Sequence, residues 1–256
     1  MEPPTPCSIR ARVSSHNVSL IPHRIEAAVN TTIAARNATL APKRSAAQAL
    51  TGMNIHNYAH RGDTAQNMLS LDQRKSLEQS IKDADVLLFS GGGNDIAGPQ
   101  LITCLNENVD GDADKAINWY RLRCHMELIK AMYYDLDEIR DHVNPKCKLV
   151  THGYDFPVPR PAGILWLGPW LYPSLEYCGW RLPQHQRSIV QQILECFNVT
   201  IRDLGIRNHL HVETQGTLLA TDWHDEMHPN RAGFRKIAMK FYDAIFDSTA
   251  KEAPIV

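Results

Sequence analysis

The stretch VLLFSGGGND at residues 86–95 decides what kind of fold this chain can adopt. Its first four residues are apolar, which is typical of a short strand that is covered on both faces of a sheet. Three glycines follow, and glycine favours a turn that needs a positive φ or a close approach of the backbone. Asn94 and Asp95 come directly after this turn. By itself, the stretch fits either an ordinary strand-to-loop turn or a strand that delivers polar side chains to a site.

On both sides of this stretch, the hydrophobic pattern alternates between strand and helix. Strands are predicted at 54–60, 85–89, 148–153 and 209–213, and helices at 64–82, 113–143, 185–204 and 230–247. Such alternation implies right-handed crossovers and a parallel sheet. We therefore predict an α/β fold, a three-layer α/β/α sandwich with a flavodoxin-like parallel sheet. The Pro-, Gly- and Trp-rich stretch that ends near residue 183 is too long for a simple connection and is predicted to form a pocket wall or lid.

The composition limits the classes of function. The chain has 256 residues, is 43% hydrophobic and 21% charged, and carries a net charge of −1, so one substantial core is expected and no nucleic-acid partner. We find no apolar run of the length that spans a bilayer and no secretory signal at the start, which predicts a cytoplasmic protein without a transmembrane segment. The six scattered cysteines lack CxxC spacing and are interpreted as reduced thiols, with three disulfides as the alternative. The oligomeric state is left open.

Residues 1–50 differ in amino-acid composition from the rest of the chain. They contain six Lys and Arg residues against two acids, which is typical of a transit peptide or of a variable leader. We therefore divide the chain into a leader of uncertain structure at 1–50 and one domain at 51–256.

Two chemistries compete for the C-terminal stretch TDWHDEMHPNRAGFRKIA at 221–238. On a helix, His224 and His228 would lie on one face and could bind zinc. Pro229 argues against that helix, because a residue that precedes proline is pushed away from the α region, and Pro229 suits the first turn of the following helix instead. Asp225 and His228 would then lie in an extended or turn segment, as a base and its orienting carboxylate. A helix cap with a surface histidine is the structural alternative.

Gly62, Asn94 and Gly153 each follow the end of a predicted strand, the edge of a parallel sheet where ligands bind. Together with the C-terminal stretch they resemble the blocks of the SGNH (GDSL-like) hydrolases. RGDT at 61–64 is similar to the glycine block of that family, GGND at 92–95 to its asparagine block, and DEMHP at 225–229 to its Asp-x-x-His block. The resemblance implies an oxyanion hole formed by the Gly62 N–H and the Asn94 amide, with His228 as general base and Asp225 as its partner.

The family's serine block, Gly-Asp-Ser-Leu, does not occur in this sequence. The nearest match is NVSL at 17–20, which makes Ser19 the candidate nucleophile, with Ser14 and Ser15 equally close in sequence. The preceding SIRARV at 8–13 is a poor buried strand because Arg10 and Arg12 occupy one of its faces. This favours a leader that does not replace the family's first strand.

The resemblance predicts a serine-type hydrolase of the esterase, lipase or deacetylase type, which acts on a small-molecule, lipid or carbohydrate ester without a metal or another cofactor. One alternative is an inactive or truncated relative with a binding role. A second alternative is a metal-dependent hydrolase that uses His224 and His228.

Overall fold

The computed structural model describes residues 63–163 and 168–251 of the chain. Its strands form a parallel sheet in the order β1 (Val86–Leu88), β2 (Lys148–His152) and β3 (His209–Val212). The predicted α/β class and the parallel sheet are therefore confirmed. The strand predicted at 54–60 and the possible strand at 8–13 lie outside the described residues.

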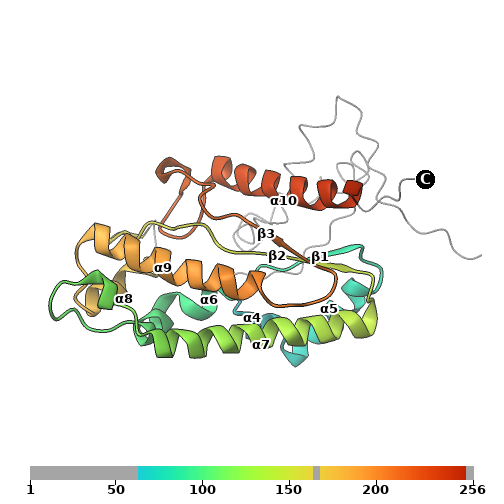
Figure 1. Ribbon diagram of the computed structural model, residues 1–256, viewed down its shortest axis with the longest axis horizontal. Coiled ribbons are helices and arrows are strands. Elements are labelled where there is room, and N and C mark those ends of the chain that lie inside the picture. Colours follow the sequence, from blue (N-terminus) through green and yellow to red (C-terminus); the bar gives the residue numbers. More distant parts are fainter. Residues whose placement is uncertain (1–62, 164–167, 252–256) are drawn as a thin grey trace, which may run out of the picture.

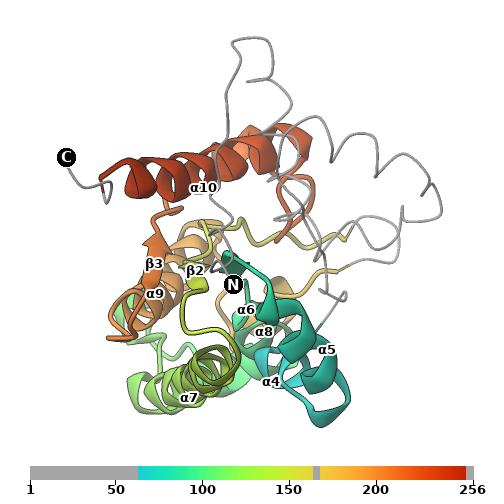
Figure 2. The same ribbon diagram turned by 90° about the vertical axis from the view of Figure 1, so that its right-hand side faces the viewer.

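Helices cover both faces of this sheet (Figure 1). The longest ones are α7 (Trp119–Val143), α9 (Pro183–Arg202) and α10 (Arg231–Lys251), and Figure 2 shows α10 on one side of the sheet with α7 and α9 on the other. In β2, Leu149 packs with the apolar residues of α7 and α9, whereas Val150 packs with those of α10. Neighbouring residues of a strand point to opposite faces, so these two form separate cores on the two sides of the sheet.

The helix predicted at 64–82 is two helices, α4 (Ala65–Met68) and α5 (Leu71–Lys82). Thr64 and Asn67 form a capping box that starts α4. Ser70 has an extended backbone and precedes α5, and its carbonyl accepts hydrogen bonds from the first turn of that helix. The helix thus restarts on the backbone of Ser70, whose side chain makes no capping hydrogen bond.

The helix predicted at 113–143 begins only at Trp119, as α7. Asn118 caps it by accepting a hydrogen bond from the Arg121 N–H, and Ile117 pairs with Leu105 in an isolated antiparallel bridge. Because Ile117 pairs with Leu105 and Asn118 is the cap, the helix cannot extend to the residues before Asn118. Several short helices were not predicted, namely α6 (Gly93–Ile96), α8 (Tyr172–Tyr177) and the 3-10 turns η1 (Gly98–Cys104), η2 (Ala113–Lys115) and η3 (Ala220–Asp222).

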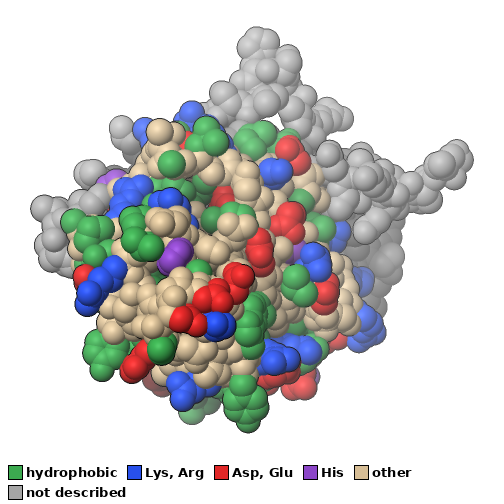
Figure 3. Space-filling model, turned by 60° about the vertical axis from the view of Figure 1, so that its left-hand side comes forward, with side chains coloured by type: hydrophobic (Ala, Val, Ile, Leu, Met, Phe, Trp, Pro, Cys, Tyr) green, Lys and Arg blue, Asp and Glu red, His purple; other side chains and the backbone are tan. Residues whose placement is uncertain are grey.

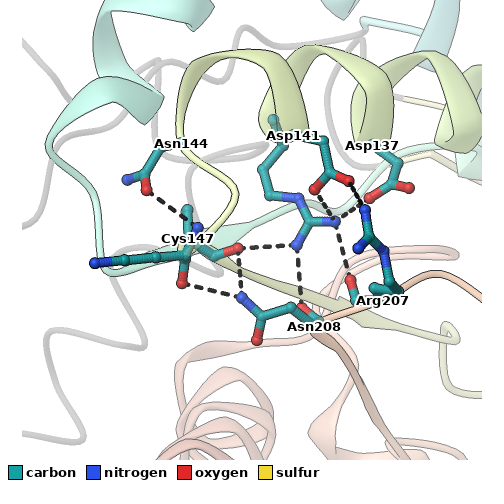
Figure 4. A network of polar contacts seen from close by, with 8 residues as sticks. Asp137, Asp141, Asn144, Cys147, Arg207 and Asn208 are labelled. Atoms are coloured by element: carbon teal, nitrogen blue, oxygen red, sulfur yellow. Dashed lines mark hydrogen bonds and ion pairs between the residues drawn. The ribbon is translucent and has the colours of Figure 1, made fainter.

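A buried arginine, Arg140, ties α7 to the amino ends of two strands. Figure 4 labels its partners Asp137, Asp141, Cys147 and Arg207. The Arg140 guanidinium donates hydrogen bonds to the carbonyl oxygens of Cys147, at 3.0 Å, and Arg207, at 2.9 Å. It also pairs with Asp137 and, at 2.9 Å, with Asp141. Cys147 and Arg207 lie just before β2 and β3, so this network, the Arg140 network, fixes the edge of the sheet opposite to the one where ligands are expected.

Acidic and basic side chains lie among apolar ones across the face drawn in Figure 3, in keeping with the small net charge. None of the helices in the described ranges has the length and apolar character needed to cross a membrane. The cysteines in these ranges, Cys104, Cys124, Cys147, Cys178 and Cys196, are free thiols.

Candidate active site

The carboxyl ends of the strands border a cavity of about 150 Å³. Segments that follow β1 and β2 line it, together with the loop that precedes α10. Its polar lining includes Ser90, Asn94, His152, Tyr154 and His228, and its apolar lining includes Leu171, Val190, Ile193, Leu194, Phe234 and Ile237. This is the position at which the parallel sheet predicts a ligand site.

Asp225 and His228 lie together beside this cavity. The Nδ1 atom of His228 is 2.9 Å from both carboxylate oxygens of Asp225, and Asp225 Oδ1 also accepts hydrogen bonds from the backbone N–H groups of Met227 and His228. Burial alone would raise the pKa of Asp225, but the hydrogen bond from His228, the charge of that imidazole and the two backbone donors lower it to about 2. An ionised carboxylate only accepts hydrogen bonds, so Nδ1 carries the proton and Nε2 is the basic nitrogen.

The loop that carries this pair is a turn, as Pro229 predicts. Trp223 and Pro229 form an antiparallel bridge, and the His228 carbonyl accepts a hydrogen bond from the His224 N–H. Pro229 does not begin the next helix, however, because the Asn230 side chain caps α10, which starts at Arg231. Asp225 and His228 are therefore held by a closed loop rather than by a helix.

His224 does not join His228 in a metal-binding arrangement. Its Nδ1 atom is 3.5 Å from Asp225 Oδ2, and more than half of its side chain is exposed. Within residues 63–163 and 168–251, no three His, Cys, Asp or Glu side chains are grouped so that they could hold a metal ion. Nδ1 of each histidine faces the Asp225 carboxylate.

The glycine run before Asn94 is required by its surroundings. Gly92 has a φ of +100°, and a Cβ atom there would lie 2.7 Å from the Phe197 ring. A Cβ atom on Gly93 would lie 2.8 Å from the Tyr154 ring. The run therefore needs both a positive φ and a close packing distance, as the sequence predicts.

Asn94 lies in the first turn of α6 and lines the cavity. Its Nδ2 atom donates a hydrogen bond to the Asp63 carbonyl at 2.8 Å, and the next residue, Asp95, accepts one from the Ala65 N–H at 2.9 Å. The GGND segment is thus joined to residues that follow the RGDT glycine. A side-chain amide has two N–H donors, and the bond to the Asp63 carbonyl uses one of them.

Gly62, Ser19, Ser14 and Ser15 lie outside the described residues. Their predicted roles, as the second oxyanion donor and as nucleophiles, stay predictions.

The cavity also holds a contact between Ser90 and His152 that the sequence did not predict. Ser90 Oγ lies 2.8 Å from His152 Nε2, and His152 Nδ1 lies 2.8 Å from the Gly153 carbonyl oxygen. The register that aligns Leu88 with Val150 brings Ser90 alongside His152, two residues further along each strand. These residues are far apart in sequence, so only a correct strand pairing could have predicted their contact.

The buried His152 and the half-buried His209 should make stability depend on pH. Burial lowers the pKa of His152 and of His209 from 6.5 to about 4. Between about pH 6.5 and pH 4 the unfolded chain therefore binds more protons than the folded one, so stability is lost as the pH falls. Each histidine contributes at most about 1.4 kcal/mol per pH unit, which corresponds to about 3–6 °C in Tm per pH unit. Circular dichroism melts from pH 7 to pH 4.5 measure this slope.

The variants His152→Gln and His209→Gln should each make that slope shallower. His142→Gln, at an exposed position in the last turn of α7, is the matched control and should leave it unchanged. If the unaltered protein and the three variants all had the same slope, His152 and His209 would not be the source of the pH dependence.

The carboxyl edge of the parallel sheet thus carries an Asp–His pair, with an asparagine amide that lines the same cavity. Residues 28–236 match the model of the GDSL-like Lipase/Acylhydrolase family, and the chain belongs to this family. The predicted membership is therefore confirmed.

Solved structures to which this chain is similar include lipases and an esterase. The lipase Lip_vut3 from a goat rumen metagenome is 13% identical, with a TM-score of 0.49, and the match covers 75% of this chain and 78% of that one. An extracellular lipase from Streptomyces rimosus is 15% identical, with a TM-score of 0.43 and coverages of 73% and 80%. A carbohydrate esterase of family 3 from Talaromyces cellulolyticus is 13% identical, with a TM-score of 0.42 and coverages of 79% and 76%. A comparison with curated protein sequences gives no match.

Proposed function

We propose that this protein hydrolyses carboxylic esters by a serine mechanism in which His228 is the general base. The observation that carries the proposal is the Asp225–His228 pair, with both carboxylate oxygens 2.9 Å from Nδ1, beside the cavity that Asn94 also lines. Because Asp225 binds the protonated Nδ1, Nε2 is left to take up a proton. Family membership supports the same reaction class.

In the proposed reaction, the oxygen of a serine from the leader, Ser19 by resemblance, attacks the ester carbonyl carbon while its proton moves to His228 Nε2. The Asn94 amide and the Gly62 N–H donate to the oxyanion that develops. The tetrahedral intermediate then collapses, and the departing alcohol takes the proton from His228. Water attacks the acyl-serine in the same way and releases the carboxylic acid.

The lining of the cavity supports an ester with an apolar group. Leu171, Ile193 and Phe234 are among the aliphatic and aromatic residues that border it. Burying an acyl or alkyl chain against such side chains is favourable by about 0.8 kcal/mol per methylene. Small-molecule, lipid and carbohydrate esters with such a group fit the proposal.

The test is hydrolysis of short p-nitrophenyl esters combined with labelling by a fluorophosphonate, which modifies an activated serine. We expect hydrolysis that survives EDTA and is lost in His228→Ala, together with an adduct that mass spectrometry maps to Ser19, Ser14 or Ser15. Loss of activity on chelation with recovery on added zinc would instead favour the metal alternative with His224 and His228.

Two further outcomes would contradict the proposal. An adduct on Ser90, the one serine among the described residues that lines the cavity, would transfer the chemistry to the Ser90–His152 pair. A folded sample with no adduct and no hydrolysis would favour the inactive relative with a binding role. The melting temperature of each sample shows whether it is folded.

A further inference from the structure

Glu226 lies between Asp225 and His228 in sequence and is 1% exposed. Its Oε2 atom accepts hydrogen bonds from the backbone N–H groups of Trp170 and, at 2.9 Å, Leu171. Its Oε1 atom accepts one from the Tyr172 N–H at 2.6 Å and a longer one, at 3.4 Å, from the Arg160 N–H. A buried carboxylate is costly unless it is paired or hydrogen-bonded, and these charge-assisted bonds meet that requirement. The carboxylate therefore fastens residues 170–172 to the loop of His228.

The segment fastened in this way contacts the imidazole itself. The Trp170 ring packs edge-to-face with the His228 ring, with 4.9 Å between the ring centroids and 88° between their planes. Leu171, the next residue, lines the cavity. Glu226 thus joins the wall beside His228 to the loop that carries His228.

We propose that Glu226 is a positioning residue for His228, which it serves by holding Trp170 against the imidazole. This inference rests on the proposed function for its effect on catalysis. Asp225 fixes the Nδ1 edge of the ring, and Trp170 restrains the tilt of the ring plane about that hydrogen bond. The tilt sets the direction of the Nε2 lone pair, and a reacting group misplaced by about 1 Å can cost about 100-fold in rate.

Glu226→Gln is the sharpest variant, because it keeps the size of the side chain and removes one acceptor. Both carboxylate oxygens accept backbone hydrogen bonds, so the amide –NH2 group would face an N–H donor in either orientation. At least one backbone donor then loses its partner, which loosens the segment of Trp170.

We expect Glu226→Gln to lower kcat on a p-nitrophenyl ester about 10- to 100-fold, with a smaller change in KM. Trp170→Leu should give a similar loss, whereas Trp170→Phe keeps an aromatic ring and should restore most of kcat. The double variant Glu226→Gln/Trp170→Leu should be no slower than the slower single variant, because both changes remove one interaction. Additive losses would overturn the inference.

Asn144→Ala is the matched control for lost stability. The Asn144 side chain donates hydrogen bonds to the carbonyls of Ile81, at 3.0 Å, and Ala84, at 2.9 Å, near the amino edge of the sheet. Its removal should lower Tm without changing kcat. An equal fall of kcat in Asn144→Ala and Glu226→Gln would mean that Glu226 acts only through stability.

Nuclear magnetic resonance measures the placement without any reaction. The ring current of Trp170 shifts the carbon-bound imidazole protons of His228, whose signals are assigned by their loss in His228→Gln. At one fixed pH, these signals should move in the same direction in Glu226→Gln and in Trp170→Leu, and stay in place in Asn144→Ala. Unmoved signals in folded Glu226→Gln would refute the inference. If the unaltered protein hydrolyses no ester, the proposed function fails, and the signals still decide whether Glu226 holds Trp170 against His228.

Discussion

Replacing Asp225 by asparagine is expected to lower kcat on a p-nitrophenyl ester by about 10⁴-fold, with little change in KM. The Asp225 carboxylate binds the Nδ1 proton of His228 from 2.9 Å and keeps Nε2 basic. An asparagine amide can donate to Nδ1 instead, which favours the tautomer with its proton on Nε2 and removes the base. Steady-state kinetics of the purified variant measure the loss.

Asp222→Asn is the matched control for this change. Asp222 is also a buried carboxylate of the same loop region, but its partners are Lys236, at 2.6 Å, and the Leu219 N–H, at 2.8 Å. Removing its charge should reduce Tm and leave kcat within a few-fold of the original. A comparable loss of kcat in both variants would show that the loop, and not the tautomer of His228, is what Asp225 controls.

The second large effect is expected at Asn94. Asn94→Ala should lower kcat by about 10²–10³-fold with little change in KM, because an oxyanion donor acts mainly in the transition state. The hydrogen bond from Nδ2 to the Asp63 carbonyl at 2.8 Å holds the amide in one orientation, so the second N–H can be ready before the charge develops. Kinetics and a thermal melt of the same sample provide the measurement.

Asn67→Ala tests whether any change near this turn has the same effect. Asn67 belongs to the capping box of α4 with Thr64, so its loss disturbs the segment next to Asp63 and keeps the Asn94 amide. It should lower Tm slightly and spare kcat. A fall in Tm with unchanged kcat in Asn94→Ala would mean that the Asn94 side chain only closes a turn.

Patterns of short range in the sequence predicted the sheet and the Asp225–His228 pair. The apolar run at 86–89 is followed within two residues by glycines. Gly92 has a φ of +100°, and neither Gly92 nor Gly93 leaves room for a Cβ atom, so the end of the run could be located from the residues alone. Pro229 excluded a helix through His228, which left the turn in which the pair now lies. In both places, the backbone is governed by residues within a few positions of the feature.

Contacts between distant segments could not be predicted in this way. Glu226 binds backbone donors more than fifty residues away, at 170–172, and a glutamate next to Asp225 carries no local mark of such a role. The break before α5 and the late start of α7 likewise depend on which residues cap and pair, because the apolar spacing continues across both points. The nucleophile stays a prediction, since no serine of this sequence stands in the family's motif.

The Arg140 network bears on how this chain can change over evolutionary time. It anchors the amino edge of the sheet, whereas the cavity lies at the carboxyl edge. Substitutions that change the substrate range and substitutions that unfold the protein should therefore arise at opposite ends of the same strands. A random-substitution library scored for cellular abundance should have its most intolerant positions around Arg140. When the same library is scored for turnover, the positions that are most intolerant to substitution should lie around His228. Laboratory evolution toward new substrates can therefore vary residues at the carboxyl edge of the sheet, while the unchanged amino edge keeps the protein folded.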